Sequence, residues 1–133
     1  MTTIHDAGPQ ELLENPNYAT VATLNRDGSI HQTVVWVSAD ADEVAVNSAV
    51  GRVWPTNLER DPHISVLVQE TDNPYHFLEI RGTASSSLEG ADAHIDALAK
   101  KYTGQDEYPY RQPGEQRIKF TVKPDHVRYV KQR

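Results

Sequence analysis

The stretch YATVATLNRDGSIHQTVVWV, residues 18–37, decides the fold class. Two runs rich in β-forming residues, 18–24 and 30–37, flank the pair Asp27 and Gly28. An Asp-Gly pair between two such runs is a strong signal for a tight β-hairpin. The stretch therefore predicts two antiparallel strands.

Strand-like runs continue along the rest of the chain. The turn SADADE leads into a strand over residues 44–48, and ISVLVQ, residues 64–69, has the β-branched content of a buried strand. After the predicted loop ETDNP, a long strand follows over residues 75–86. Its period-two alternation puts Tyr75, Phe77, Glu79 and Arg81 on one face and His76, Leu78, Ile80 and Gly82 on the other. We expect a bend or bulge at the glycine.

Helices interrupt the strands at three places. Residues 6–16 read as a short helix, PTNLERD predicts about two turns beginning at Pro55, and apolar residues at helical spacing make 90–102 the clearest helix. A polar loop and two closing strands within residues 117–130 complete the chain. The sequence predicts a mainly β domain over residues 1–133, a small closed antiparallel barrel of six or seven strands with two or three short helices.

Composition excludes several classes of function. The 133 residues are 38% hydrophobic and 24% charged, which is typical of one globular domain. The net charge of −6 argues against nucleic acid as the main partner. The absence of cysteine excludes disulfides and thiolate sites. No apolar run reaches the length of a membrane span, and the first residues lack a signal-peptide pattern, so we expect a cytoplasmic protein.

Familiar catalytic motifs are missing. No GxGxxG, GxxxxGK[ST], GxSxG or HExxH pattern occurs, and the histidines show no metal-ligand spacing, so no metal is expected. Asp92 and Asp96, four residues apart, are most simply a solvated helix face. Trp36 is a possible stacking platform, although a core position is more common in a barrel strand. No side chain resembles a nucleophile beside its base, so no catalytic residue is assigned.

Arg52 is the strongest candidate for a binding residue. It follows Asn47 and Ser48 at the end of a strand and precedes the helix expected from Pro55. Free backbone N–H groups at a helix start attract anions, and a guanidinium binds phosphate or carboxylate well. From spacing alone, a surface arginine paired with Glu59 or Asp61 is the simpler alternative.

Longer stretches resemble a known family. YATVATLNRDGSIHQTVVWV, then VNSAVGRVWPTNLERDPHISVLVQETDNPYHFLEIRGTA, and finally HIDALAKKYTGQDEYPYRQPGEQRIKF resemble the pyridoxamine 5′-phosphate oxidase-like split-barrel superfamily. Within it, they are similar to the actinobacterial oxidoreductases that use the deazaflavin coenzyme F-420. The turn NLERDP, a β-run and the segment DNPY…EIRGTA are specific in combination.

The resemblance implies an FMN-binding-like split barrel that forms a homodimer, with a cofactor in each of two grooves at the subunit interface. The flavin or deazaflavin ring would lie against the second strand, and the phosphate would be held at the end of a later strand and the start of the short helix. Tyr75 and Phe77 could complete the groove from the other subunit. The implied cofactor-binding residues are Gln32, Thr33, Val34, Val35, Asn47, Ser48, Ala49, Arg52, Trp54, Asn57, Tyr75 and Phe77.

The sequence departs from the family pattern after Arg52. Many relatives carry a lysine two places later and another basic residue two further on, where this chain has Trp54 and Thr56. The departure weakens the case for a phosphate-rich ligand. The indole could stack on the ring, pack against the cofactor's tail or belong to the core.

The function implied by the resemblance is hydride transfer from reduced F-420 to a small unsaturated or electrophilic organic substrate. Tyr75, Tyr110 or a water molecule would supply the proton. The alternatives are an FMN-dependent oxidase or reductase, a carrier of a flavin-type cofactor that is not an enzyme, and, with least support, a haem-binding relative.

Overall fold

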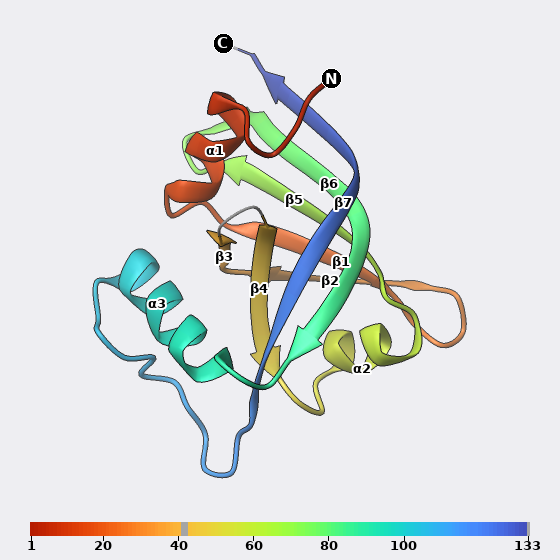
Figure 1. Cartoon of the computed structure of the whole chain (residues 1–133), viewed down its shortest axis with the longest axis vertical. Coiled ribbons are helices and arrows are strands. Elements are labelled where there is room, and N and C mark those ends of the chain that lie inside the picture. Colours follow the sequence, from red (N-terminus) through yellow and green to blue (C-terminus); the bar gives the residue numbers. More distant parts are fainter. Residues whose placement is uncertain (41–42, 133) are drawn as a thin grey trace.

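The chain folds into one strongly curled antiparallel sheet with three helices around it (Figure 1). The computed structural model describes residues 1–40 and 43–132. Sheet order is β2-β1-β5-β6-β7-β4-β3, so β2 and β3 are the two edges. The predicted mainly β fold of six or seven antiparallel strands with two or three short helices is confirmed, and the sheet curls into a half-barrel rather than closing completely. The elements are α1 (Ala7–Glu14), β1 (Ala19–Leu24), β2 (Ile30–Val35), β3 (Val37–Asp40), β4 (Glu43–Ala49), α2 (Val53–Arg60), β5 (His63–Glu70), β6 (Asn73–Ser87), α3 (Ala91–Thr103) and β7 (Arg117–Lys131).

The predicted hairpin is confirmed. β1 and β2 pair antiparallel from Ala19↔Val35 to Leu24↔Ile30. Gly28 adopts φ 87° in the turn, and the Asp27 carboxylate accepts hydrogen bonds from the backbone N–H and the hydroxyl of Ser29. These bonds to the ionised form lower the pKa of the Asp27 carboxyl.

The second strand ends earlier than the sequence suggests. β2 stops at Val35, and after Trp36 the chain continues as β3, which pairs with β4 at the other edge of the sheet. The expected strand over residues 30–37 thus contains all of β2 and the first residue of β3. A break of one residue leaves no signal in the composition, so the sequence did not indicate it. The predicted turn in SADADE includes residues 41–42, which lie outside the described residues.

The two predicted closing strands are one, the 15-residue β7. It pairs with β6 and with β4. Pro124 suggests a break because it cannot donate to a ladder. The structure instead places it opposite Gly82, where the register shifts between Arg81 and Gly82. The predicted irregularity at Gly82 is confirmed, and Asp125 is the extra residue on β7 that it accommodates.

Gly82 permits a close approach of two backbones, so alanine should not fit. A Cβ atom at this position would lie 2.0 Å from the Lys123 carbonyl oxygen. We expect Gly82→Ala to lower the free energy of unfolding by about 1–3 kcal/mol, measured by urea denaturation. Ser85→Ala, at an exposed position of the same strand, should change it by less than about 0.5 kcal/mol. Equal stability of the two variants would contradict the close approach.

The core fills the inside of the curled sheet. It is built from the inward side chains of the strands, with α1 adding Leu12 and Leu13 and α2 adding Trp54 and Leu58. In Figure 1, α1 and α2 lie at opposite ends of the curled sheet.

Strand β4 is buried on both of its faces. Val44 and Val46 belong to the core, whereas the Asn47 side chain points to α3 and donates to the Ala91 carbonyl oxygen at 3.0 Å. Ile95 and Leu98 lie on the buried side of α3, as its periodicity predicts. The contact between α3 and the sheet therefore contains both polar groups, such as Asn47, and apolar side chains, such as Ile95 and Leu98.

Candidate functional site

A groove of about 250 Å³ lies where the β2–β3 junction, α3 and the segment before β7 meet. Its apolar part comes from the end of β2 and from α3, and its polar part comes from β4, the start of α2 and the start of β7. The lining residues are Tyr18, Val34, Val35, Trp36, Asn47, Arg52, Ile95, Leu98, Tyr108, Tyr110 and Arg117.

One wall of the groove is aromatic. The Trp36 ring stacks on the Tyr102 ring with centroids 5.3 Å apart and an interplanar angle of 10°, and it meets Tyr108 edge-on at 5.9 Å. The Tyr102 hydroxyl donates to the Asn17 carbonyl at 2.6 Å and accepts from the Val37 N–H at 3.1 Å. Burial raises the pKa of Tyr102 to about 12, so this hydroxyl stays protonated and acts as a fixed support for the indole.

The polar end of the groove holds two arginines joined by one carboxylate. Arg117 Nη1 lies 2.9 Å from Glu115 Oε1, and Arg52 Nη2 lies 3.1 Å from the same oxygen. Arg117 Nε donates to Asn47 Oδ1 at 3.0 Å, and its guanidinium lies 5.0 Å from the Tyr108 ring centre. Two cations thus meet beside an aromatic wall, an arrangement suited to a ligand with an anionic group and a planar apolar body.

The two arginines differ in exposure. The Arg117 side chain is 3% exposed and that of Arg52 is 51% exposed. Arg117 is therefore a fixed charge at the inner end of the groove, and Arg52 is the cation more open to solvent. Glu115, at 6%, is nearly as buried as Arg117.

The helix beside Arg52 begins two residues earlier than predicted. α2 starts at Val53 with Arg52 at its N-cap, and Pro55 is its third residue. The Thr56 N–H and hydroxyl both donate to the Arg52 carbonyl, at 3.2 and 2.8 Å. Pro55 has no N–H, so Val53 and Trp54 are the residues of the first three that carry a backbone N–H. The ion-pair partner of Arg52 is Glu115 rather than Glu59 or Asp61.

Four of the twelve residues implied by the family resemblance line the groove: Val34, Val35, Asn47 and Arg52. Four further implied residues lie on β2 and β4 beside these but do not line the groove. Gln32 is exposed and Thr33 half-buried on β2. Ser48 and Ala49 are buried on β4, and the Ser48 hydroxyl has no hydrogen-bond partner among the described residues.

The remaining four residues lie away from the groove within one chain. Trp54 is 5% exposed and packs on Phe120 at 5.2 Å, which favours the core alternative for the indole. Asn57 donates to Thr23 Oγ1 and to Asn25 Oδ1 at the hairpin. Tyr75 and Phe77 lie near the start of β6, which Figure 1 places at the opposite end of the sheet from α2.

Sequence reasoning missed the second arginine and the carboxylate between the two. Glu115 and Arg117 are far from Arg52 in the chain, and neither belongs to a recognisable motif. The β4–β7 ladder brings them to Arg52, since it pairs Ala49 with Arg117. The aromatic pair Tyr108 and Tyr110 inside a long polar loop was an available signal, because such loops are often functional.

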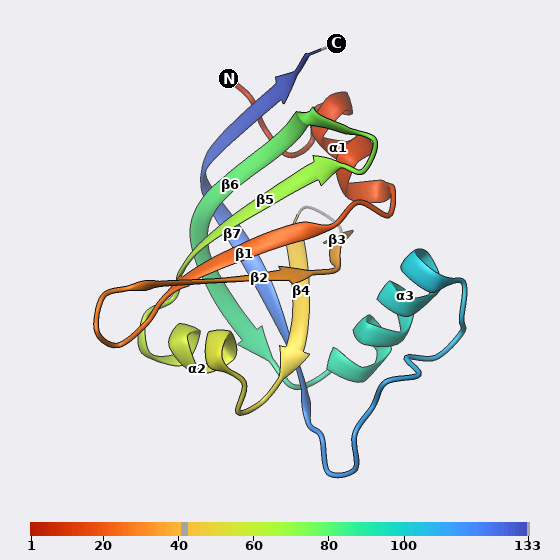
Figure 2. The same cartoon turned by 180° about the vertical axis from the view of Figure 1, so that it is seen from behind.

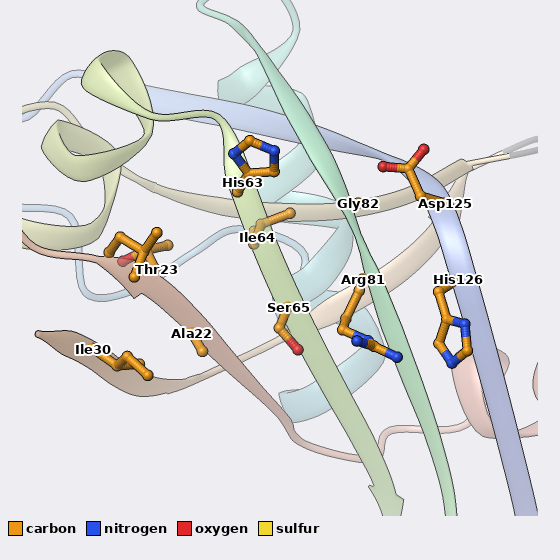
Figure 3. Close-up of a pocket in the computed structure, with 11 residues that line it drawn as sticks. Ala22, Thr23, Ile30, His63, Ile64, Ser65, Arg81, Gly82, Asp125 and His126 are labelled. Atoms are coloured by element: carbon orange, nitrogen blue, oxygen red, sulfur yellow. The ribbon is translucent and has the colours of Figure 1, made fainter. Parts of the chain in front are cut away.

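A second groove, of about 450 Å³, lies on the outer face of the sheet (Figure 3). It crosses β1, β5, β6 and β7, and Figure 3 shows Arg81 and His126 on neighbouring strands with Asp125 nearby. In the described part of the chain, no group of His, Asp and Glu residues is arranged to bind a metal ion. The lining residues are Ala22, Thr23, Leu24, Ile30, His63, Ile64, Ser65, Arg81, Gly82, Asp125 and His126.

Comparison with known proteins identifies relatives over nearly the whole chain. The family model for pyridoxamine 5′-phosphate oxidase matches residues 9–131. No curated protein matches the sequence significantly. Several solved structures match. One is an F-420 reductase that is 25% identical to this chain with a TM-score of 0.77, and the aligned region covers 90% of this chain and 94% of the reductase chain.

Two further solved structures have the same fold at lower identity. A conserved protein, Rv2991, from Mycobacterium tuberculosis is 20% identical with a TM-score of 0.76 and covers 98% of this chain and 84% of its own. A candidate pyridoxamine 5′-phosphate oxidase from Listeria innocua is 21% identical with a TM-score of 0.68, and the aligned region covers 90% of this chain and 92% of that protein's chain.

Proposed function

The chain belongs to the pyridoxamine 5′-phosphate oxidase family, and we propose that it is an oxidoreductase that uses the deazaflavin coenzyme F-420. The supporting observation is the convergence of Arg52 and Arg117 at the end of an aromatic-lined groove. The similarity to an F-420 reductase over 90% of the chain favours F-420 over FMN.

The residues present fit an anionic cofactor with a planar ring. Trp54 and Thr56 stand where many relatives have cations, but the buried Arg117 supplies a second cation from another strand. Charge-assisted hydrogen bonds contribute about 1.5–3 kcal/mol each, so a contact from Arg117 would offset the loss of one such cation. Val34, Val35 and Trp36 offer the apolar surface that a ring needs.

When bound, the reduced deazaflavin would supply a hydride to an electrophilic carbon of the substrate. The chain's own residues would bind the phosphate through Arg52 and Arg117, orient the ring against the end of β2, and exclude water with the aromatic wall. The substrate then needs a proton at the adjacent atom. We propose Tyr110 as its donor, because Tyr110 lines the groove and is 60% exposed, whereas Tyr75 does not line the groove of this chain.

One chain does not enclose the whole cofactor. A volume of about 250 Å³ is below the roughly 300–1,000 Å³ of typical small-molecule sites, and the deazaflavin carries a long tail. We therefore propose that residues 1–133 form one cofactor-binding domain that works as a homodimer, with each site completed by the second copy.

The outer face of β2, β1 and β5 is the proposed dimer surface. Ile30 and Val34 on β2 are 67% and 65% exposed, and the neighbouring outer residues Thr20 and Leu67 are half-buried. Figure 2 shows no described helix over this face. None of the described helices has the length and apolar character needed to cross a membrane. Exposed apolar side chains gathered on one face are typical of a protein–protein interface.

A charge placed on the outer face should separate the dimer. We expect Ile30→Glu to shift the molar mass measured by light scattering from two chains to one, because a buried unpaired carboxylate opposes association. Ala93→Glu, at an exposed position of α3, should leave the mass unchanged. A wild-type mass of one chain, or a dimeric Ile30→Glu variant, would contradict this surface.

Titration with F-420 and with FMN tests the proposed function. Quenching of the ring fluorescence should give a dissociation constant in the micromolar range or below for F-420, with FMN at least about tenfold weaker. Turnover of an enone, quinone or nitro compound with reduced F-420 should follow. Binding of FMN alone would favour an FMN-dependent enzyme, binding without turnover a carrier, and binding of neither would refute the proposal.

A further inference from the structure

Glu115 is an unusual residue for a loop between a helix and a strand. Its side chain is 6% exposed, and Oε1 lies within 3.1 Å of a nitrogen from each arginine. Its second oxygen, Oε2, accepts from the Gln112 N–H at 3.3 Å. A carboxylate in this position occupies the donors that an anionic ligand would need.

A ligand phosphate and this carboxylate cannot share both guanidinium groups well. Two anions a few ångströms apart repel each other, and the repulsion is strong where water is excluded. The arginine nitrogens that converge on Oε1 can satisfy one anionic oxygen between them at a time. Binding of a phosphate to these two nitrogens therefore requires Glu115 to leave.

We propose that Glu115 is an internal occupant of the anion site, displaced when the cofactor's phosphate binds, and that it thereby sets the affinity of the groove for anionic ligands. This inference rests on the proposed function. It assigns a role to Glu115, which contacts both arginines of the site.

The segment around Glu115 allows a local movement. Gly114, directly before it, has φ 76°, and the Glu115 N–H donates to the Gln112 carbonyl in a short turn. Arg111 is tied to Asp92 and Asp96 on α3 by two contacts of 2.7 Å. The displaced unit is therefore the Glu115 side chain and its turn, not the whole loop.

Charge sets the direction of the effect. With Glu115 ionised, the three groups carry a net charge of +1, and Glu115→Gln raises it to +2 while keeping the size of the side chain. The substitution removes the negative charge that competes with a ligand phosphate and leaves the positive charge of the two arginines uncompensated. We expect phosphate-bearing ligands to bind the variant about tenfold more tightly.

Two probes test the proposal in the full chain. Inorganic phosphate should raise the melting temperature of Glu115→Gln more than that of the wild type, and F-420 should bind it about tenfold more tightly. Glu107→Gln, at an exposed position of the same loop, is the matched control for the charge change and should behave as wild type. Addition of Arg52→Ala to Glu115→Gln should abolish the gain.

Glu115→Asp covers the case in which the glutamine variant folds poorly. It keeps the charge but shortens the side chain, so it should hold the two arginines less well and bind F-420 more tightly than wild type, by a smaller factor than glutamine. Unchanged or weaker binding in both folded variants would overturn the inference.

The results separate this inference from the proposed function. If wild-type protein binds F-420 through Arg52 but neither Glu115 variant gains affinity, the inference fails and the function stands. If Glu115→Gln responds more strongly to inorganic phosphate while no form binds F-420 or FMN, the anion site stands and the function fails.

Discussion

Replacement of Arg52 by alanine should raise the dissociation constant for F-420 by about 10- to 100-fold, because a charge-assisted contact of about 1.5–3 kcal/mol is lost. The same change should shift the melting temperature of the cofactor-free protein by no more than about 3 °C. Arg52 is half-exposed, and an ion pair with one exposed partner contributes about 0–1 kcal/mol to stability. Fluorescence titration and thermal denaturation measure the two quantities.

Arg26→Ala provides the control for Arg52→Ala. Arg26 is exposed in the turn between β1 and β2, so its removal changes the net charge equally without touching the groove. It should leave the dissociation constant within about twofold. An Arg52→Ala variant that also stays within that range would show that the phosphate binds elsewhere.

Replacement of Arg117 by methionine should have the largest effect on stability, a loss of about 3–5 kcal/mol in the free energy of unfolding. The variant leaves Glu115 without its buried cation and removes the hydrogen bond to Asn47. F-420 binding should fall as well, because the fixed cation of the groove is gone. Urea denaturation and the same titration measure these effects.

A double variant separates charge from packing at Arg117. Arg117→Met combined with Glu115→Gln removes both buried charges, so it should be more stable than Arg117→Met alone by about 1–3 kcal/mol. Additive losses in the double variant would contradict the ion pair.

Features set by local sequence were predictable. The hairpin at Asp27 and Gly28, the alternation along β6 and the apolar face of α3 each depend on residues a few positions apart. The family resemblance implied a cofactor site at Arg52, Asn47 and the end of β2. These residues line one groove, and its role as a cofactor site stays a prediction.

Features set by distant pairing were not predictable. Pro124 suggested a break in β7, but the bulge opposite Gly82 accommodates it. Arg117 and Glu115 reach Arg52 through the β4–β7 ladder, and no spacing rule connects positions so far apart. Trp54 is buried against Phe120, and this burial follows from where α2 packs.

A crystal structure of the protein with bound F-420 tests the central claim most directly. We predict phosphate oxygens within about 3 Å of guanidinium nitrogens of both Arg52 and Arg117, with the Glu115 carboxylate turned away. A phosphate bound elsewhere, with Glu115 still bridging the two arginines, would contradict the account.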